Sequence, residues 1–111
     1  MSGKVVIPGY VREALEELSK RLKEVLGNEF QLYLFGSYAR GDWLRDSDID
    51  LVVVSPRFRG IPKYLRAPMV RRLARPDLPF DILCYTPEEL GELIRESTAF
   101  REVTTYWRRL R

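Results

Sequence analysis

The sequence predicts an α/β fold in one small domain, residues 1–111. Two observations support this class. Near the amino terminus, apolar residues recur every three or four positions, as they do on a helix, and further along three short apolar runs are typical of strands. A chain of 111 residues can bury one core but has little left for a second, so we expect a single sheet flanked by helices.

Two helices have clear sequence signals. The first is expected between the Pro-Gly pair at residues 8–9 and the Gly-Asn pair at residues 27–28, because its apolar residues form one stripe. The second begins at the Thr-Pro-Glu-Glu segment, residues 86–89, which predicts a capping box with proline at the first helical position. The apolar stripe of the first helix consists of Val11, Leu15, Leu18, Leu22 and Val25, and the second helix presents Leu90, Leu93 and Ile94.

Strands are predicted at residues 30–35, 48–55 and 80–85. Each is a short apolar run bounded by glycine, proline or charged residues, and the Leu-Val-Val-Val segment inside the second run has the strongest strand pattern in the chain. All three runs are expected to be largely buried.

The remaining segments have weaker patterns. Prolines interrupt residues 56–79 and predict a loop with one short helix at residues 68–74, with Pro68 at its first position. The tail is expected to form a short helix and then an edge strand near residues 104–107.

Composition narrows the class of protein. No apolar stretch approaches the roughly 20 residues that span a bilayer, and no signal-peptide pattern opens the chain, so we expect no membrane partner and a cytoplasmic protein. The single cysteine, Cys84, is expected in the core. The net charge of +3 is modest, but residues 57–75 contain only basic charges. That segment is either a solvated face or an electropositive wall for a triphosphate, an RNA end or an acidic partner, so a nucleic-acid ligand is allowed but not required.

Two carboxylates at the start of the second strand suggest a metal site. Side chains alternate along a strand, so Asp48 and Asp50 are expected to share one face. Their mutual repulsion would be relieved by a divalent cation. Magnesium suits such a site because the donors are hard oxygens and the chain has no histidine. The alternative for Asp48 is a turn residue at the strand entry.

A third carboxylate, Asp81, lies within the third apolar run. A buried, unpaired carboxylate there would be costly. If its strand lies beside the Asp48 strand, Asp81 completes a triad and can act as general base toward an attacking hydroxyl. The alternative is a structural pair with an arginine.

A glycine segment, residues 36–41, comes before these aspartates. Gly36 would let the backbone approach a phosphate and Ser37 would add a hydroxyl donor. Arg40 is expected either to contact the phosphates or to brace the loop, and Gly41 to end the turn with a backbone that favours glycine. Without the aspartates, the same residues would indicate only a strand-to-helix turn.

The ordered set Gly-Ser-Tyr-Ala-Arg-Gly, then Ser-Asp-Ile-Asp-Leu at residues 47–51, then Asp81 resembles the nucleotidyltransferase signature of the DNA polymerase beta superfamily. The short length is similar to that of the minimal nucleotidyltransferases, which are encoded beside a helical HEPN partner. The resemblance implies a mixed sheet of three to four strands flanked by helices. It also implies two Mg²⁺ ions on Asp48, Asp50 and Asp81, and transfer of a nucleoside monophosphate from a triphosphate such as ATP to a hydroxyl.

The same resemblance implies a partner. In the HEPN systems the minimal nucleotidyltransferase is the antitoxin, and some members adenylylate a tyrosine of the ribonuclease toxin. This chain is therefore expected to bind ATP through Gly36, Ser37 and Arg40 and to modify a HEPN protein. Two alternatives stay open: an antitoxin that masks the toxin without catalysis, and nucleotidyl transfer to tRNA or a small molecule.

Overall fold

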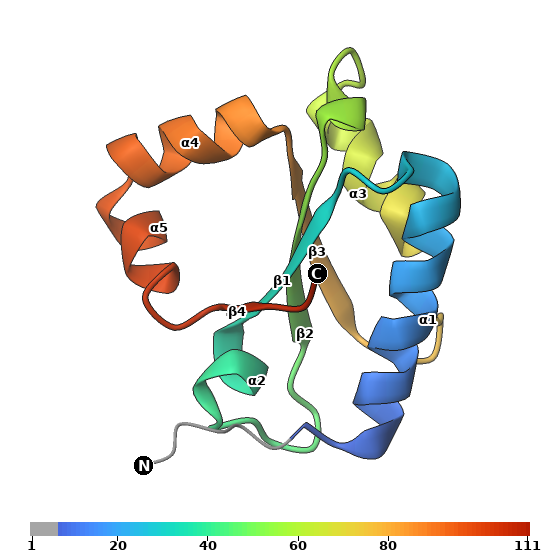
Figure 1. The fold of residues 1–111 in the computed structure, drawn as a ribbon. Helices are drawn as coiled ribbons and strands as arrows, with labels where there is room; N and C mark the ends of the chain where they lie inside the picture. Colours follow the sequence, from blue (N-terminus) through green and yellow to red (C-terminus); the bar gives the residue numbers. More distant parts are fainter. Residues whose placement is uncertain (1–6) are drawn as a thin grey trace.

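The computed structural model describes residues 7–111 and contains a four-stranded mixed sheet with the strand order β3-β2-β1-β4. Strand β1 pairs antiparallel with both β2 and β4, whereas β2 and β3 run parallel (Figure 1). This confirms the predicted mixed sheet. The strands are β1 (Gln31–Phe35), β2 (Ile49–Val54), β3 (Phe80–Tyr85) and β4 (Arg108–Arg109).

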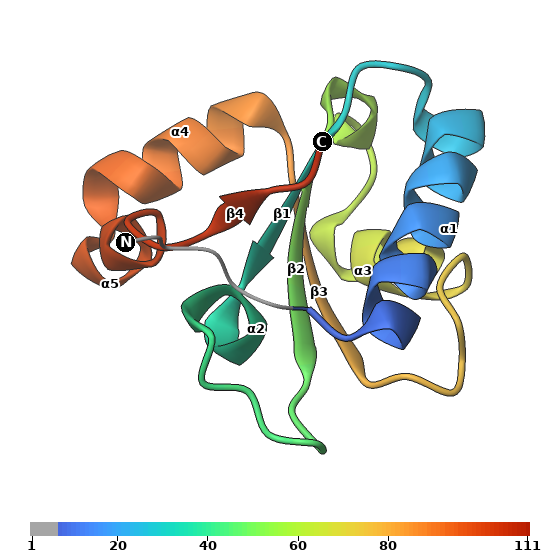
Figure 2. The same ribbon diagram turned by 60° about the horizontal axis from the view of Figure 1, so that its bottom comes forward.

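Helices cover both faces of the sheet. Helices α1 and α3 lie on one face and α4 and α5 on the other, while the short helix α2 follows directly after β1 (Figures 1 and 2). The helices are α1 (Gly9–Leu26), α2 (Gly36–Arg40), α3 (Lys63–Arg71), α4 (Pro87–Glu96) and α5 (Thr98–Val103), with a 3-10 turn η1 at Pro56–Phe58.

Strand β2 is the centre of the molecule. Its apolar side chains are buried on both faces, as the continuous apolar run predicted. Ile49, Leu51 and Val53 join the larger core with α1 and α3, whereas Val52 and Val54 pack with Leu90 of α4 and the aromatic residues around it. The sheet therefore has a thick core on the α1 face and a smaller one on the α4 face.

Helix α1 confirms the predicted amphipathic helix with one change, because Val25 is exposed and Leu26 takes its place in the core. None of the helices within residues 7–111 is long and apolar enough to cross a membrane. Helix α4 begins at the predicted capping box. The Thr86 hydroxyl accepts from the Glu89 backbone N–H at 3.2 Å, and the Glu89 carboxylate accepts from the Thr86 N–H at 2.8 Å.

The predicted short helix at residues 68–74 is wrong. The helix here is α3, which begins five residues earlier, after Pro62, and contains Pro68 in its interior. Proline is tolerated best in the first turn of a helix, so the sequence predicted a helix that begins at Pro68. In the structure, Arg66 and Val70 are the buried positions, one turn apart, and their burial holds the helix despite the backbone hydrogen bond that proline cannot donate.

The tail also differs from expectation. Residues 104–106 form the turn that ends α5, and the edge strand is β4, four residues later than the start of the predicted one. Trp107 lies between the two and stacks on Tyr33 of β1, with ring centroids 4.0 Å apart. Because this stacking fixes Trp107 over the sheet, pairing with β1 begins only after it.

A buried ion pair joins α3 to α4. The Arg66 side chain, only 6% exposed, donates to the Glu89 carboxylate and to the backbone carbonyl of Ile61. On the surface nearby, Arg59 pairs with Glu88, and both of those side chains are more than half exposed. The two neighbouring pairs therefore differ mainly in burial.

Loss of the buried Arg66–Glu89 pair is expected to destabilise the fold more than loss of the surface pair. Glu89→Gln keeps the shape and most capping-box geometry but leaves the Arg66 charge buried without a counter-ion. We expect the free energy of unfolding to fall by about 2–4 kcal/mol. Glu88→Gln, the surface control, should lower it by less than about 1 kcal/mol. Urea denaturation of both variants measures the difference, and equal effects would contradict the importance of burial.

Candidate active site

The parallel pairing of β2 and β3 brings two of the predicted aspartates together. Asp50 and Asp81 are direct partners in the register, so their side chains lie on the same face of the sheet, the face of α4 and α5. The charge of Asp81 acts directly on Asp50. Asp48 directly precedes β2, is exposed, and lies close enough for its charge to act on Asp50. The expected strand neighbours are confirmed.

Asp50 is the electrostatic centre of this group. Burial, then the charges of Asp81 and Asp48, raise its pKa from 3.8 to about 6, while the positive charge of Arg40 acts in the opposite direction. A carboxylate pushed toward its protonated form by its neighbours is a group that a cation would return to the ionised form. The donors are all carboxylate oxygens, which suit a hard cation such as Mg²⁺.

The three aspartates do not yet form a closed metal site. Across residues 7–111, no group of three histidine, cysteine, aspartate or glutamate side chains is gathered closely enough to hold one ion. The aspartates would have to move closer together to share a cation. Their chemistry and their common face fit a metal.

Asp81 lies beside β2 as predicted, but the burial that was expected for its strand is wrong. The third apolar run was expected to be completely buried, but β3 is an edge strand with alternating burial, and both Asp81 and Leu83 are exposed. An exposed carboxylate does not need a partner to avoid a desolvation cost. Its exposure instead makes Asp81 accessible to an acceptor molecule.

Gly36 packs directly against Asp50. Its backbone φ is +70°, in the left-handed region that side chains rarely adopt, and a Cβ added there would lie 2.0 Å from Oδ2 of Asp50. The glycine segment and the carboxylates are therefore parts of one site. Only a glycine lets the start of α2 approach the aspartate so closely.

The rest of the glycine segment forms α2. Ser37 is half-buried, and its carbonyl accepts the backbone N–H of Gly41, which ends the helix with a φ of 91° as predicted. Tyr38 is buried and stacks on Trp43, with centroids 5.5 Å apart, so both are packing residues. The helix is thus anchored through one side chain while its first turn faces Asp50.

Arg40 is braced from two sides. Its Nε donates to the Asp42 carboxylate at 3.2 Å, and one terminal nitrogen donates to the Tyr106 hydroxyl at 3.4 Å. Bracing was one of the two predicted roles, and phosphate contact stays a prediction. Tyr106 was missed as a site residue, because it lies 66 positions away and nothing in the tail sequence indicates its direction.

The helical part of the basic segment, α3, is not on the face of the aspartates. Helix α3 packs on the α1 face, opposite the aspartates, and most of the arginines already have structural partners. Arg66 pairs with Glu89, Arg75 pairs with Asp77, and Arg71 donates to the carbonyls of Arg75 and Leu78. Most of these side chains are therefore held by structural contacts, and a role of the segment as an electropositive wall stays a prediction. A surface that is mostly structural and partly solvated agrees with the structure.

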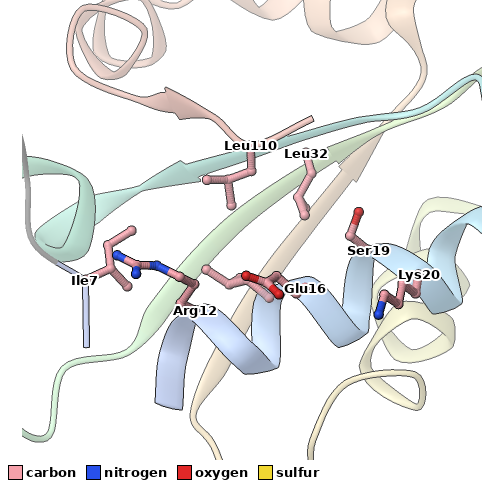
Figure 3. A pocket seen from close by; sticks show the side chains of 8 residues that line it. Ile7, Arg12, Glu16, Ser19, Lys20, Leu32 and Leu110 are labelled. Carbon is pink, nitrogen blue, oxygen red and sulfur yellow. The ribbon is translucent and has the colours of Figure 1, made fainter. Parts of the chain in front are cut away.

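A cavity of about 410 Å³ lies elsewhere, between α1 and the β1-β4 edge (Figure 3). Its floor includes Leu32 and Leu110, and Arg12, Glu16 and Lys20 of α1 lie at its rim. Because Leu32 faces the α1 core, this cavity lies on the opposite side of the sheet from Asp50. It is not part of the carboxylate site.

Comparisons with known proteins identify the family of this chain. Residues 11–107 match the family described as the nucleotidyltransferase domain. Among curated proteins, a candidate protein adenylyltransferase of Methanocaldococcus jannaschii is 29% identical over 72 residues, which make up 64% of this chain and 71% of the relative.

Solved structures share the fold. A candidate nucleotidyltransferase from Sulfolobus solfataricus has a TM-score of 0.61 and 28% identity, covering 74% of each chain. A second candidate nucleotidyltransferase has a TM-score of 0.56 and 25% identity, covering 94% of this chain and all of the other. A toxin-antitoxin structure with AMP-PNP has a TM-score of 0.51 at 23% identity, covering 86% of this chain and 72% of that one, and shows likeness of fold alone.

The family match runs from α1 to the tail and includes the glycine segment and all three aspartates. It confirms the resemblance that these motifs indicated. This chain therefore belongs to the nucleotidyltransferase domain family, and its enzymatic class is that of a nucleotidyltransferase.

Proposed function

We propose that this protein is a Mg²⁺-dependent adenylyltransferase that transfers AMP from ATP to a tyrosine hydroxyl of a HEPN toxin and so acts as its antitoxin. The observation that carries the proposal is the Asp50–Asp81 pair, which lies side by side on parallel strands, with Asp50 packed against the backbone of Gly36. Carboxylates for a cation and a glycine turn for phosphates lie within one small site.

Each group has a role that follows from its position. Gly36 and the half-buried Ser37 would bind the phosphates through the first backbone N–H groups of α2, which have no acceptor within the helix. Asp48, Asp50 and Asp81 would hold two Mg²⁺ ions. Bound there, the ions would neutralise charge on the phosphates and the leaving group.

The position of Asp81 allows it to accept the proton of the attacking hydroxyl. Asp81 is exposed at the sheet edge, where an acceptor hydroxyl can reach it. As the hydroxyl oxygen bonds to the α-phosphorus, its proton passes to the Asp81 carboxylate, the bond between the α-phosphorus and the bridging oxygen breaks, and pyrophosphate leaves. Asp50, which is half-buried and beneath Gly36, is suited to holding a cation rather than to exchanging protons with an acceptor.

A protein acceptor is supported by the relative from M. jannaschii, whose description is that of a protein adenylyltransferase. The toxin-antitoxin structure that shares the fold fits the antitoxin role. The HEPN identity of the partner comes from the sequence resemblance. These three supports concern the acceptor, whereas the chemistry rests on the carboxylate site.

Incubation of the purified protein with its HEPN partner, ATP labelled at the α-phosphate and Mg²⁺ tests the proposal. We expect covalent label on the partner and a loss of at least about a hundredfold in Asp48→Ala, because several kcal/mol of charge stabilisation is removed. Asp46→Ala is the matched control, since Asp46 is an exposed aspartate two residues away outside the site. It should label the partner like wild type.

Other outcomes would identify another function. If Asp48→Ala still neutralises the toxin and no label appears with wild type, the protein acts by masking. Label on tRNA or on a small molecule, with none on the HEPN protein, would show that the acceptor class is wrong while the nucleotidyl transfer is right.

A further inference from the structure

The carboxyl-terminal tail contacts the end of α2 that is furthest from Asp50. After α5 the chain passes beside α2 and then pairs with β1 as β4 (Figures 1 and 2). Arg108 donates through Nε to the carbonyl of Ala39 at 3.3 Å, and Tyr106 accepts from Arg40 at 3.4 Å. Two successive residues of α2 are therefore held by the tail.

Tyr106 contacts Arg40 in two ways. Besides the hydrogen bond to its hydroxyl, the Arg40 guanidinium carbon lies 5.5 Å from the centre of the tyrosine ring, a cation-π distance. On the other side, Asp42 accepts from Nε of the same guanidinium. Arg40 is more than one-third exposed, so without these contacts its long side chain would sample several rotamers.

The tail is itself firmly placed. Trp107, the next residue, stacks on Tyr33 with an interplanar angle of 10°, and Phe100 of α5 packs edge-on against it at 6.1 Å. Beyond Trp107, Arg108 is in register with Leu34 in the β1-β4 ladder. Tyr106 therefore extends from an anchored segment and can fix a neighbour.

Bracing leaves Arg40 able to bind a ligand. A guanidinium has five N–H groups. Among residues 7–111, Asp42 and Tyr106 accept one each, so within this part of the chain three N–H groups are left for other acceptors. Arg40 lies on the same five-residue helix as Gly36, which packs against Asp50, and its positive charge acts on that carboxylate.

We infer that Tyr106 is a positioning residue for nucleotide binding, because it holds Arg40 in place with three N–H groups left for the phosphates of ATP. This inference rests on the proposed function. A flexible arginine would lose rotamer freedom on binding phosphate, whereas a braced one has lost it already. Removing the brace should therefore weaken ATP binding without slowing the chemical step.

The test is a double-mutant cycle between Tyr106 and Arg40. Tyr106→Phe removes the hydroxyl and keeps the ring, and we expect it to raise the Kd for AMP-PNP with Mg²⁺ by about two- to tenfold, the cost of ordering one long side chain. In the Arg40→Ala background the same change should have no further effect. In transfer assays the KM for ATP should rise while kcat is unchanged.

Controls separate positioning from folding. Tyr64→Phe alters an exposed tyrosine on α3, on the far face of the sheet, and should leave Kd, KM and Tm unchanged. Tyr106→Phe should likewise keep the wild-type Tm. Arg40→Lys keeps the positive charge and loses the fork that binds Asp42 and Tyr106 together, so its Kd should respond little to Tyr106→Phe.

An unchanged Kd in Tyr106→Phe, or an equal rise in both backgrounds, would overturn the inference. Wild-type protein that binds AMP-PNP but transfers no nucleotide would contradict the proposed reaction. In that case the Kd values for AMP-PNP in the double-mutant cycle would decide the role of Tyr106. Wild-type protein that binds no AMP-PNP would overturn both.

Discussion

Asp50→Asn is expected to abolish nucleotidyl transfer and at the same time to stabilise the metal-free protein above pH 6. The amide keeps the size of the side chain. It lacks the charge that a cation requires, so activity should fall by about a hundredfold or more, the equivalent of several kcal/mol of lost charge stabilisation.

The gain in stability follows from the raised pKa of Asp50. The folded protein holds the Asp50 proton up to about pH 6, whereas the unfolded chain releases it near pH 3.8. Between these values the folded state binds more protons, so wild-type stability falls as pH rises through this window and stays low above it. Without solvent screening, a pKa raised from 3.8 to about 6 corresponds to a loss of roughly 3 kcal/mol in the free energy of unfolding at high pH. Solvent screening of a half-buried group reduces the expected effect to about 1 kcal/mol.

Thermal and urea unfolding in EDTA at pH 4, 6 and 8 measures this effect. The asparagine variant should lose the fall in stability that wild type shows between pH 4 and 6. Asp77→Asn is the control with the opposite sign, because the hydrogen bond from Arg75 lowers the pKa of that surface carboxylate. It should not stabilise the protein at pH 8 and should keep full activity. A difference in stability between Asp50→Asn and wild type that stays the same from pH 4 to pH 8 would contradict the assigned role of Asp50.

The sequence was sufficient to locate the carboxylates because strand geometry has a fixed period. Once residues 48–55 and 80–85 are strands, alternation decides which side chains share a face, and a parallel register then places Asp50 beside Asp81. Gly36 could be predicted as a point of close approach, because glycine alone permits it. Only the structure shows that the group packed against Gly36 is Asp50 itself.

The errors have one common cause, which is that local patterns do not reveal tertiary partners. Burial of Arg66 against Glu89 of α4 starts α3 earlier than its proline suggested. The apolar run of β3 suggested complete burial, but the strand order places this strand at an edge of the sheet.

Gly36→Ala is expected to damage both stability and activity. The left-handed backbone at φ +70° costs an alanine roughly 1 kcal/mol. In addition, the new Cβ would lie 2.0 Å from Oδ2 and 2.9 Å from Cγ of Asp50, so that carboxylate must move away from Asp81 or α2 must shift. We expect a total loss of about 2–4 kcal/mol in the free energy of unfolding, comparable to overpacking a core.

Gly60→Ala separates the two causes. Gly60 has a similar φ of 82°, but nothing lies within 4 Å of an added Cβ, so this variant carries the backbone strain without the collision. It should lose about 1 kcal/mol and keep its activity. The collision can also be relieved from the other side, since Asp50→Ala removes the two closest atoms, and the next nearest, the Asp50 Cβ, lies at 3.2 Å. The double variant Gly36→Ala/Asp50→Ala should therefore be more stable than Gly36→Ala alone. If Gly36→Ala instead matches Gly60→Ala in stability and activity, the glycine segment and the carboxylates are not one packed unit.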